Sequence, residues 1–107
     1  DYVFNVATLP TQADKYRATG FTTVGGGPAA TAAVAIAKLG GAALLAARVG
    51  DDPVATTMEQ ELRGYGVDCQ WLRRCAGRQS SLSAVFVDAA GERMIVNHID
   101  PQMPLEA

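Results

Sequence analysis

The sequence predicts an α/β fold in which a buried core is joined to a sheet with one open face. Residues from Pro28 to Leu39 are almost all small or apolar, which is typical of a buried helix. Residues from Ala42 to Val49 form a continuous apolar run, which indicates a strand of a parallel sheet covered on both faces. Strand-like segments near both ends also carry polar residues, so they are expected to form the open sheet.

Length and composition indicate one globular domain or part of one. The chain has 107 residues, 49% of them hydrophobic, and a formal net charge of −2, which gives no indication of disorder or of a nucleic-acid surface. No apolar run reaches the length of a membrane span, and Asp1 begins the chain without a start Met or a signal peptide. We therefore expect a cytoplasmic segment of a longer chain, with neither nucleic acid nor membrane as partner. Cys69 and Cys75 lack metal-ligand spacing, which favours free thiols and leaves a disulfide open.

The first elements are expected to be two exposed antiparallel strands followed by a helix. Asp1 to Val6 and Tyr16 to Val24 contain aromatic and Thr residues, and Pro10 lies in the loop between them. Pro28 suits the first turn of the helix and Gly40 suits its carboxyl end. This helix is expected to be buried nearly all round.

A second helix is expected to follow the strand at Ala42 to Val49. Asp52 is a favourable N-cap, and Pro53 suits the first helical position. Gly64 and Gly66 end the helix, and the residues expected to pack on the sheet recur every four positions: Val54, Met58 and Leu62. We interpret Asp51 and Asp52 as structural residues.

The last elements are expected to be a short strand around Gln70 to Arg73 and then a hairpin. The hairpin strands are Leu82 to Val87 and Arg93 to Asn97, and the turn of about five residues between them contains Gly91. These two strands are expected to join the open sheet of the amino terminus.

Gly25, Gly26 and Gly27 precede the first helix and allow two interpretations. Backbone without side chains can approach a ligand closely, which indicates a substrate cradle, but a tight turn into a helix has the same composition. A dinucleotide site needs a buried strand before the glycines, and the preceding residues are half polar. A P-loop is excluded, because no Gly-Lys-Ser/Thr follows the glycines.

These motifs resemble the amino-terminal third of a ribokinase-like carbohydrate kinase of the PfkB family. The glycines precede an Ala-rich helix that ends Lys38-Leu39-Gly40, and the sequence Arg48-Val49-Gly50-Asp51-Asp52 and the hairpin with Gly91 follow. The resemblance spans essentially the whole chain and implies a three-layer α/β/α sandwich with a β-sheet lid that closes over the sugar. The lid strands would lie at about residues 1–24 and 82–98, and part of the α/β core at about residues 25–75.

Within the family, the chain is similar to the branch that phosphorylates 6-deoxy-6-sulfofructose at its C1 hydroxyl, the sulfofructose kinases. GGGPAATAA, Asp14-Lys15-Tyr16, Gln79-Ser80-Ser81 and Gly91-Glu92-Arg93 with Asn97 carry this similarity. It implies that Asp1 grips sugar hydroxyls, that Gly25, Gly26 and Gly27 lie against the sugar, and that Lys15 and Asn97 bind the sulfonate. Ala30 stands where the family usually has a sugar-binding Asn, which puts ordinary ribose recognition in doubt. A generic ketose or ribose-type kinase remains the alternative.

The resemblance implies that the chemistry needs residues outside this segment. The family's catalytic Asp lies in a Gly-Ala-Gly-Asp-like turn of the carboxy-terminal half, and no such turn occurs here. We therefore assign no catalytic residue, expect ATP and Mg to bind mainly outside the segment, and expect activity only in the full-length parent. The open sheet is expected to form a homodimer, because its apolar face and unpaired edges need a cover. A non-catalytic α/β module that uses this sheet for association remains open.

Overall fold

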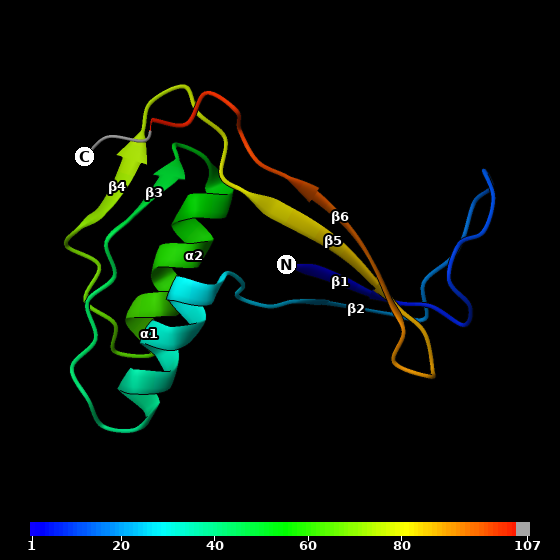
Figure 1. Ribbon diagram of the computed structural model, residues 1–107, viewed down its shortest axis with the longest axis horizontal. Coiled ribbons are helices and arrows are strands. Elements are labelled where there is room, and N and C mark those ends of the chain that lie inside the picture. The colour runs from blue at the N-terminus through cyan, green and yellow to red at the C-terminus, as the bar shows by residue number, and fades with distance from the viewer. Residues whose placement is uncertain (105–107) are drawn as a thin grey trace. The chain divides into compact units, whose positions relative to one another are not determined.

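The computed structural model describes residues 1–104, which form two compact units. The sheet unit contains Asp1–Val24 and Leu82–His98, and the helical unit contains Gly25–Ser81 with the chain from Ile99 onward. The element order is β1, β2, α1, β3, α2, β4, β5 and β6 (Figure 1). Neither helix of the described part is both long and apolar enough to cross a membrane.

The sheet unit is a four-stranded sheet with the order β2-β1-β5-β6. The strands are β1 (Tyr2–Asn5), β2 (Gly20–Thr23), β5 (Leu82–Val87) and β6 (Arg93–His98). β1 is antiparallel to β2 and parallel to β5, and β5 is antiparallel to β6. The expected antiparallel strands, the hairpin and its joining to the amino-terminal sheet are confirmed.

The turn between β5 and β6 is built by one carboxylate and one glycine. Oδ1 of Asp88 accepts the backbone N–H groups of Ala90 and Glu92, each at 3.0 Å. Gly91 has φ +83°, a conformation that residues with a Cβ rarely adopt. The Gly-containing turn of five residues is therefore found as expected.

The helical unit contains the helices α1 (Pro28–Lys38) and α2 (Pro53–Gly64) and a parallel pair of strands, β3 (Ala47–Gly50) and β4 (Leu72–Cys75). Asp52 caps α2 by accepting the backbone N–H of Ala55 at 3.0 Å. Both helices end in the glycine turn predicted from the sequence, at Gly40 (φ +85°) and Gly66 (φ +86°). The core between the helices and the strands contains Ala33, Ala43, Leu45, Leu62, Val67 and Cys69.

Two expectations of burial are wrong for the described part of the chain. Helix α1 buries only Ala33, whereas Ile36 is 47% and Leu39 88% exposed. Residues 42–49 are not a strand covered on both faces, because β3 begins at Ala47 and Leu44 is 50% exposed. Ala33, Ala43 and Leu45 pack into the core, whereas Ile36, Leu39 and Leu44 stay largely exposed. Apolar composition does not distinguish these two environments.

The strand expected at Gln70 to Arg73 begins two residues later, at Leu72. The backbone N–H of Gln70 donates to Oδ1 of Asp68 at 3.0 Å, and the N–H of Leu72 donates to the carbonyl of Cys69. This local turn uses the backbone groups that would otherwise pair in the sheet. Cys69 and Cys75 are both free and buried, as the sequence favours.

Candidate functional site

Two predicted sugar-binding residues lie on one face of the sheet unit. Asn97 pairs with Ser83 in the register of β5 and β6. Continuing the parallel register of β1 with β5, in which Tyr2 pairs with Ala84, brings Asp1 opposite Ser83. Residues directly opposite each other on neighbouring strands share a face. Asp1, Ser83 and Asn97 therefore form one row across three strands, which we call the polar row.

The side-chain amide of Asn97 is engaged within the polar row. Its Nδ2 donates to Oγ of Ser83 at 2.9 Å and to the carbonyl of Leu82 at 3.2 Å. An Asn amide has two N–H donors, so both are used, and donation to a sulfonate requires that one bond be exchanged. Asp1 is exposed. Its backbone nitrogen donates to the carbonyl of Val24 at 2.7 Å, and its carbonyl accepts the backbone N–H of Val24 at 2.9 Å. The side chain of Asp1 therefore extends from backbone that is fixed by hydrogen bonds to Val24.

Lys15 lies in the loop of residues 6–19, at the opposite end of β1 from Asp1 (Figure 1). Its backbone N–H donates to Oδ1 of Asp14 at 2.7 Å. Within residues 1–104, its ammonium forms no ion pair. The structure brings Asp1 and Asn97 together but does not bring Lys15 beside them.

The same loop borders a pocket of about 310 Å³ in the sheet unit. The phenolic oxygen of Tyr16 accepts the backbone N–H of Thr11 at 3.2 Å. This hydrogen bond stabilises the phenolate and lowers the pKa of Tyr16 below its usual value. The pocket is largely apolar and is lined by Phe4, Val6, Pro10, Tyr16, Arg17, Ala18 and Phe86.

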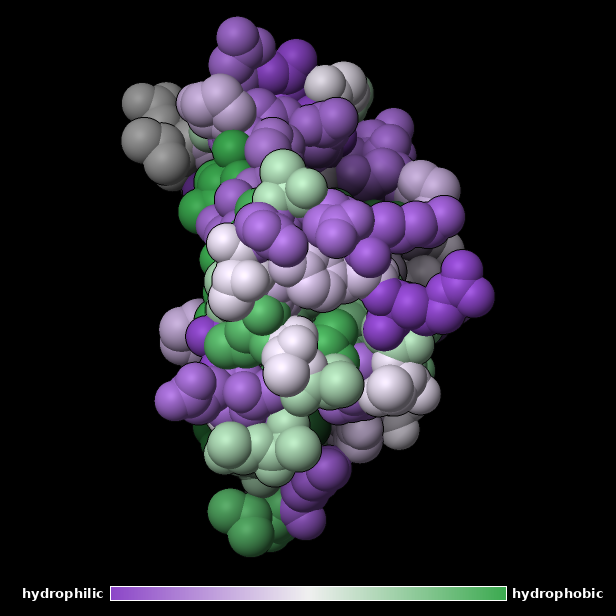
Figure 2. All heavy atoms as spheres, turned by 90° about the vertical axis from the view of Figure 1, so that its right-hand side faces the viewer, coloured by the Kyte–Doolittle hydropathy of each residue, from purple (hydrophilic) through white to green (hydrophobic). Residues whose placement is uncertain are grey.

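The face of the sheet opposite the polar row is aromatic. The ring of Phe4 lies 5.0 Å from that of Phe21 and 5.7 Å from that of Phe86, measured between centroids. Val96 shares this face and is 61% exposed, whereas the neighbouring Ile95 points to the polar-row face and is 59% exposed. Figure 2 shows hydrophilic and hydrophobic residues mixed on the side that it presents, without one large apolar patch. We therefore define the aromatic face by the alternation of side chains along the paired strands.

The glycine loop, Gly25 to Gly27, lies in the helical unit directly before α1. Gly27 has φ +89°, which accounts for a glycine at that position. A Cβ added to Gly27 would meet nothing within 4 Å, and one added to Gly25 would meet only Oε2 of Glu61, at 4.0 Å. Crowding within residues 1–104 therefore does not explain Gly25, and these residues leave the space beside the loop open.

The start of α1 presents backbone donors beside this open loop. Gly27 is the N-cap and supplies no side chain, and Pro28 has no N–H. The backbone N–H groups of Ala29 and Ala30 lie in the first turn, where an α-helix has no internal acceptors. Such groups can donate to sugar hydroxyls or to an anion.

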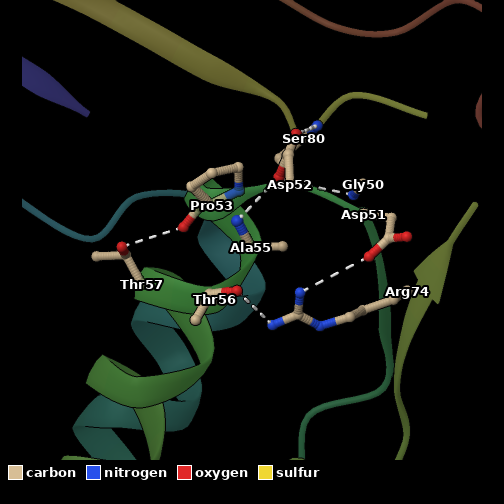
Figure 3. Close-up of polar contacts among 9 residues, drawn as sticks. All are labelled: Gly50, Asp51, Asp52, Pro53, Ala55, Thr56, Thr57, Arg74 and Ser80. Atoms are coloured by element: carbon tan, nitrogen blue, oxygen red, sulfur yellow. Dashed lines mark hydrogen bonds and ion pairs between the residues drawn. The ribbon is translucent and has the colours of Figure 1, made fainter. Parts of the chain in front are cut away.

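A cluster of polar bonds lies at the carboxyl end of β3 (Figure 3). The hydroxyl of Ser80 donates to Oδ1 of Asp52 at 2.7 Å and accepts the backbone N–H of Gly50 at 3.0 Å. The backbone N–H of Ser80 donates to Oδ2 of Asp52 at 2.8 Å. Burial alone would raise the pKa of Asp52, but the hydrogen bonds from Ser80 and Ala55 and the charge of Arg74 outweigh it, so the pKa is lowered.

Sequence reasoning identified only part of this cluster. It interpreted Asp52 as a helix cap, which is confirmed, but it did not predict the bonds to Ser80. It gave no role to Asp100, whose Oδ2 accepts the backbone N–H of Gln79 at 2.9 Å. For Ser80 and Asp100, the only signal in the sequence was their position close to the two ends of the predicted hairpin.

Comparison with known proteins identifies the family. The model of the pfkB family of carbohydrate kinases matches residues 1–106. The chain belongs to this family. It is 36% identical over 80 residues to a fructokinase of Klebsiella pneumoniae, which covers 75% of this chain and 26% of the relative. It is 27% identical over 96 residues to a deoxyribokinase of Salmonella typhi, with coverage of 90% and 31%.

Solved structures agree with the ribokinase-like fold expected from the sequence. A candidate ribokinase from Agrobacterium tumefaciens superposes with a TM-score of 0.91 at 31% identity, over 99% of this chain and 35% of the other. A ribokinase from Cryptococcus neoformans in complex with ADP superposes with a TM-score of 0.76 at 27% identity, over 91% of this chain and 30% of the other. The chain thus spans only about a quarter to a third of these relatives.

Proposed function

We propose that this chain is the sugar-binding and lid portion of an ATP-dependent sugar kinase that phosphorylates a ketohexose. The family supports a carbohydrate kinase, and the fructokinase similarity supports a fructose-like substrate. The observation that carries the proposal is the open glycine loop, because no contact within the described chain requires a glycine at Gly25. A sugar that packs against backbone does require one.

The proposed sugar contacts follow the resemblance to the family, residue by residue. Asp1 of the polar row accepts hydrogen bonds from sugar hydroxyls, which suits an exposed carboxylate on an ordered strand. Gly25, Gly26 and Gly27 pack against the sugar, and the first N–H groups of α1 donate to its oxygens. The sheet unit acts as the lid, with strands at about residues 1–24 and 82–98, and the helical unit contributes part of the α/β core.

We propose 6-deoxy-6-sulfofructose as the substrate, phosphorylated at C1. A sulfonate stays anionic at physiological pH and needs donors with positive charge. The ammonium of Lys15 has no ion-pair partner among residues 1–104, which supports its use for a ligand. Asn97 is the second proposed ligand, through exchange of its bond to Ser83 or Leu82. Because Lys15 and Asn97 lie at opposite ends of the sheet, this assignment requires the loop of residues 6–19 to move on binding.

The nucleotide and its metal ion are proposed to be held mainly by residues outside this segment. No three His, Cys, Asp or Glu side chains in residues 1–104 are grouped so as to hold a metal ion. ATP, bound with Mg, would supply the phosphoryl group. The residues here bind and orient the sugar and exclude water from it.

We also propose that the full-length protein is a homodimer that pairs through the aromatic face of the sheet unit. Phe21 is 57% and Val96 61% exposed on that face. A second copy would bury both, while the polar row on the opposite face would remain free for the sugar.

The proposal is tested by sugar-dependent ADP formation in the full-length gene product. Fructose, ribose, fructose 6-phosphate and 6-deoxy-6-sulfofructose are supplied separately with ATP and Mg, and the phosphorylated position is determined by NMR. We expect turnover with a ketohexose and phosphorylation at C1. Binding of sugars without ADP release would instead support the non-catalytic association module, and preferred turnover of ribose would support a ribose-type kinase.

A further inference from the structure

The hairpin of β5 and β6 leaves and re-enters the helical unit through two short polar segments. The chain passes from one unit to the other after Ser81 and returns at Ile99. We call residues 78–80 the outgoing root and residues 100–102 the returning root. Ser80 is 2% and Asp100 9% exposed, although both lie next to exposed residues. Buried polar groups at the base of a hairpin need partners, and these partners determine how firmly its base is fixed.

The outgoing root is fixed to the start of α2. Both oxygens of the Asp52 carboxylate accept hydrogen bonds from Ser80, at 2.7 and 2.8 Å (Figure 3). The same carboxylate caps α2 through Ala55, so one side chain joins the root to the helix. Gly50 lies against the root so closely that an added Cβ would collide with backbone atoms of Arg78 and Ser80.

The returning root is fixed to the outgoing one by Asp100. Its Oδ2 accepts the backbone N–H of Gln79 at 2.9 Å, and its Oδ1 accepts that of Gln102 at 2.9 Å. The guanidinium of Arg78 lies 3.7 Å from Oδ1 of Asp100 and donates to Oε1 of Gln102 at 2.6 Å. The two roots are therefore bound to each other, and the outgoing root is also bound to Asp52 at the start of α2.

We propose that Asp52 and Asp100 are positioning residues that fix the two roots and confine bending of the hairpin to Ser81–Leu82 and His98–Ile99. This inference rests on the proposed function, in which the hairpin is part of the lid over the sugar. The carboxylates do not contact the sugar; they hold the base about which the lid turns. Hydrogen bonds to a charged acceptor are stronger than neutral ones, which suits an anchor that must resist the motion of the lid.

Asp52→Asn and Asp100→Asn test the roots in the full-length protein. Asn keeps the size of the side chain and one acceptor oxygen, so Asp52→Asn can still cap α2 while presenting N–H to one Ser80 donor. Asp51→Asn is the matched control, because it makes the same chemical change one residue away. Among residues 1–104, the Asp51 carboxylate forms a long ion pair, 4.0 Å from Arg74, and it shares none of the root bonds that Asp52 and Asp100 make.

The first measurement is amide hydrogen exchange without substrate. We expect Asp52→Asn to speed exchange at Ser80, and Asp100→Asn at Gln79, by about tenfold or more, with the paired amides of β5 and β6 unchanged. Asp51→Asn should leave both roots as in the wild type. Unchanged exchange at the roots in both variants would overturn the proposal, whatever reaction the protein catalyses. If Asp52→Asn does not fold, Asp100→Asn alone decides, since Asp100 caps neither α1 nor α2.

The second measurement separates positioning from general stability. With the sugar that the full-length protein phosphorylates, both variants should raise the KM for the sugar several-fold and leave the KM for ATP unchanged. A loss of active protein would lower the apparent kcat and leave both KM values unchanged, which would overturn the positioning role. If no sugar is phosphorylated, the proposed function fails, and the exchange experiment still decides whether the two carboxylates fix the roots.

Discussion

Asn97 donates from Nδ2 to the hydroxyl of Ser83 at 2.9 Å, directly across the register of β6 and β5. This bond holds a predicted ligand residue in the same row as Asp1, on the face opposite the aromatic rings. The bond also has a cost for an anion-binding role, because the donor must leave Ser83 before it can bind a sulfonate. Among residues 1–104 the ammonium of Lys15 has no ion-pair partner, so the two residues should contribute unequally.

Lys15→Met is predicted to weaken the use of 6-deoxy-6-sulfofructose far more than the use of fructose. The substitution removes a charge-assisted contact worth about 1.5 to 3 kcal/mol, or roughly tenfold to a hundredfold in kcat/KM. Asn97→Ala should act in the same direction with a smaller effect, because its amide must first give up a bond within the sheet. For each variant, kcat/KM for 6-deoxy-6-sulfofructose and for fructose is measured by steady-state kinetics in the full-length protein.

Lys38→Met is the control for charge, since Lys38 is the only other lysine. Its ammonium lies over the ring of Tyr65, 4.8 Å from the centroid, in the helical unit. Lys38→Met should leave the ratio of kcat/KM for 6-deoxy-6-sulfofructose to kcat/KM for fructose unchanged. Equal losses for sulfofructose and fructose in Lys15→Met would remove the sulfonate assignment and leave a generic ketose kinase.

Gly25→Val is predicted to keep the fold and to weaken sugar binding by about tenfold or more. Among the described residues the nearest atom to an added Cβ is Oε2 of Glu61 at 4.0 Å, so the added branches have room within this part of the chain. They would occupy the volume that the proposed sugar needs. The melting temperature and the KM for sugar are measured together.

Gly64→Ala is the control for Gly25→Val, because among the described residues an added Cβ at Gly64 meets nothing within 4 Å, as open a position as Gly25. Gly64 is the last residue of α2, where Ala is the better helix former. We expect unchanged kinetics and equal or higher stability. Normal sugar affinity in a folded Gly25→Val protein would return the glycine loop to a simple turn before a helix.

Val96→Glu and Ile95→Glu form a matched pair that tests the dimer. The residues are adjacent and similarly exposed, at 61% and 59%, but they point to opposite faces of the sheet. Val96→Glu should raise the dissociation constant of the dimer by about a hundredfold or more, because a charge would be buried in an apolar interface. Ile95→Glu should leave the dimer intact and weaken sugar binding.

Analytical ultracentrifugation of the full-length wild type and of both variants measures the dissociation constant of the dimer, and the KM for sugar measures the effect of Ile95→Glu on sugar binding. A wild-type protein that sediments as a monomer at micromolar concentration contradicts the proposed assembly. A dimer that is broken by Ile95→Glu rather than by Val96→Glu would exchange the roles of the two faces.

Local signals explain why some elements could be predicted from the sequence almost to the residue. Asp52 and Pro53 mark the start of α2, and Gly66 marks its end, because N-caps, first-turn prolines and left-handed glycines act on their own neighbours in the chain. The hairpin turn is predictable for the same reason, since Asp88 and Gly91 form it by themselves.

The roots and the burial pattern depend instead on residues far apart in the sequence. Ser80 meets Asp52 across 28 positions and Gln79 meets Asp100 across 21, and such bonds leave no periodic trace. Helix α1 is apolar around its circumference, so its composition does not indicate which side faces the core. The polar row is partly predictable: Asp1 and Asn97 were both expected to bind ligand, but only the strand register brings them together.

The lowered pKa of Asp52 predicts how acid acts on the helical unit. A carboxylate whose pKa is lower in the folded than in the unfolded chain stabilises the fold above its ordinary pKa of 3.8, and this stabilisation is lost as the pH falls through the folded value. We therefore expect the wild type to exceed Asp52→Asn in free energy of unfolding at pH 7, by an amount that stays constant down to about pH 5. Below pH 3.8 the difference should shrink, because protonation removes from the wild type the charge that the variant already lacks.

Urea unfolding of the wild type, Asp52→Asn and Asp51→Asn between pH 2.5 and 7 measures this difference. Asp51→Asn corrects for the loss of one negative charge, since its side chain touches neither Ser80 nor Ala55. After this correction, the pH dependence that remains belongs to the hydrogen bonds of the Asp52 carboxylate. A difference between the wild type and Asp52→Asn that does not change from pH 7 to pH 2.5 would mean that those bonds do not depend on the charge of Asp52, and the electrostatic account of the outgoing root would have to be abandoned.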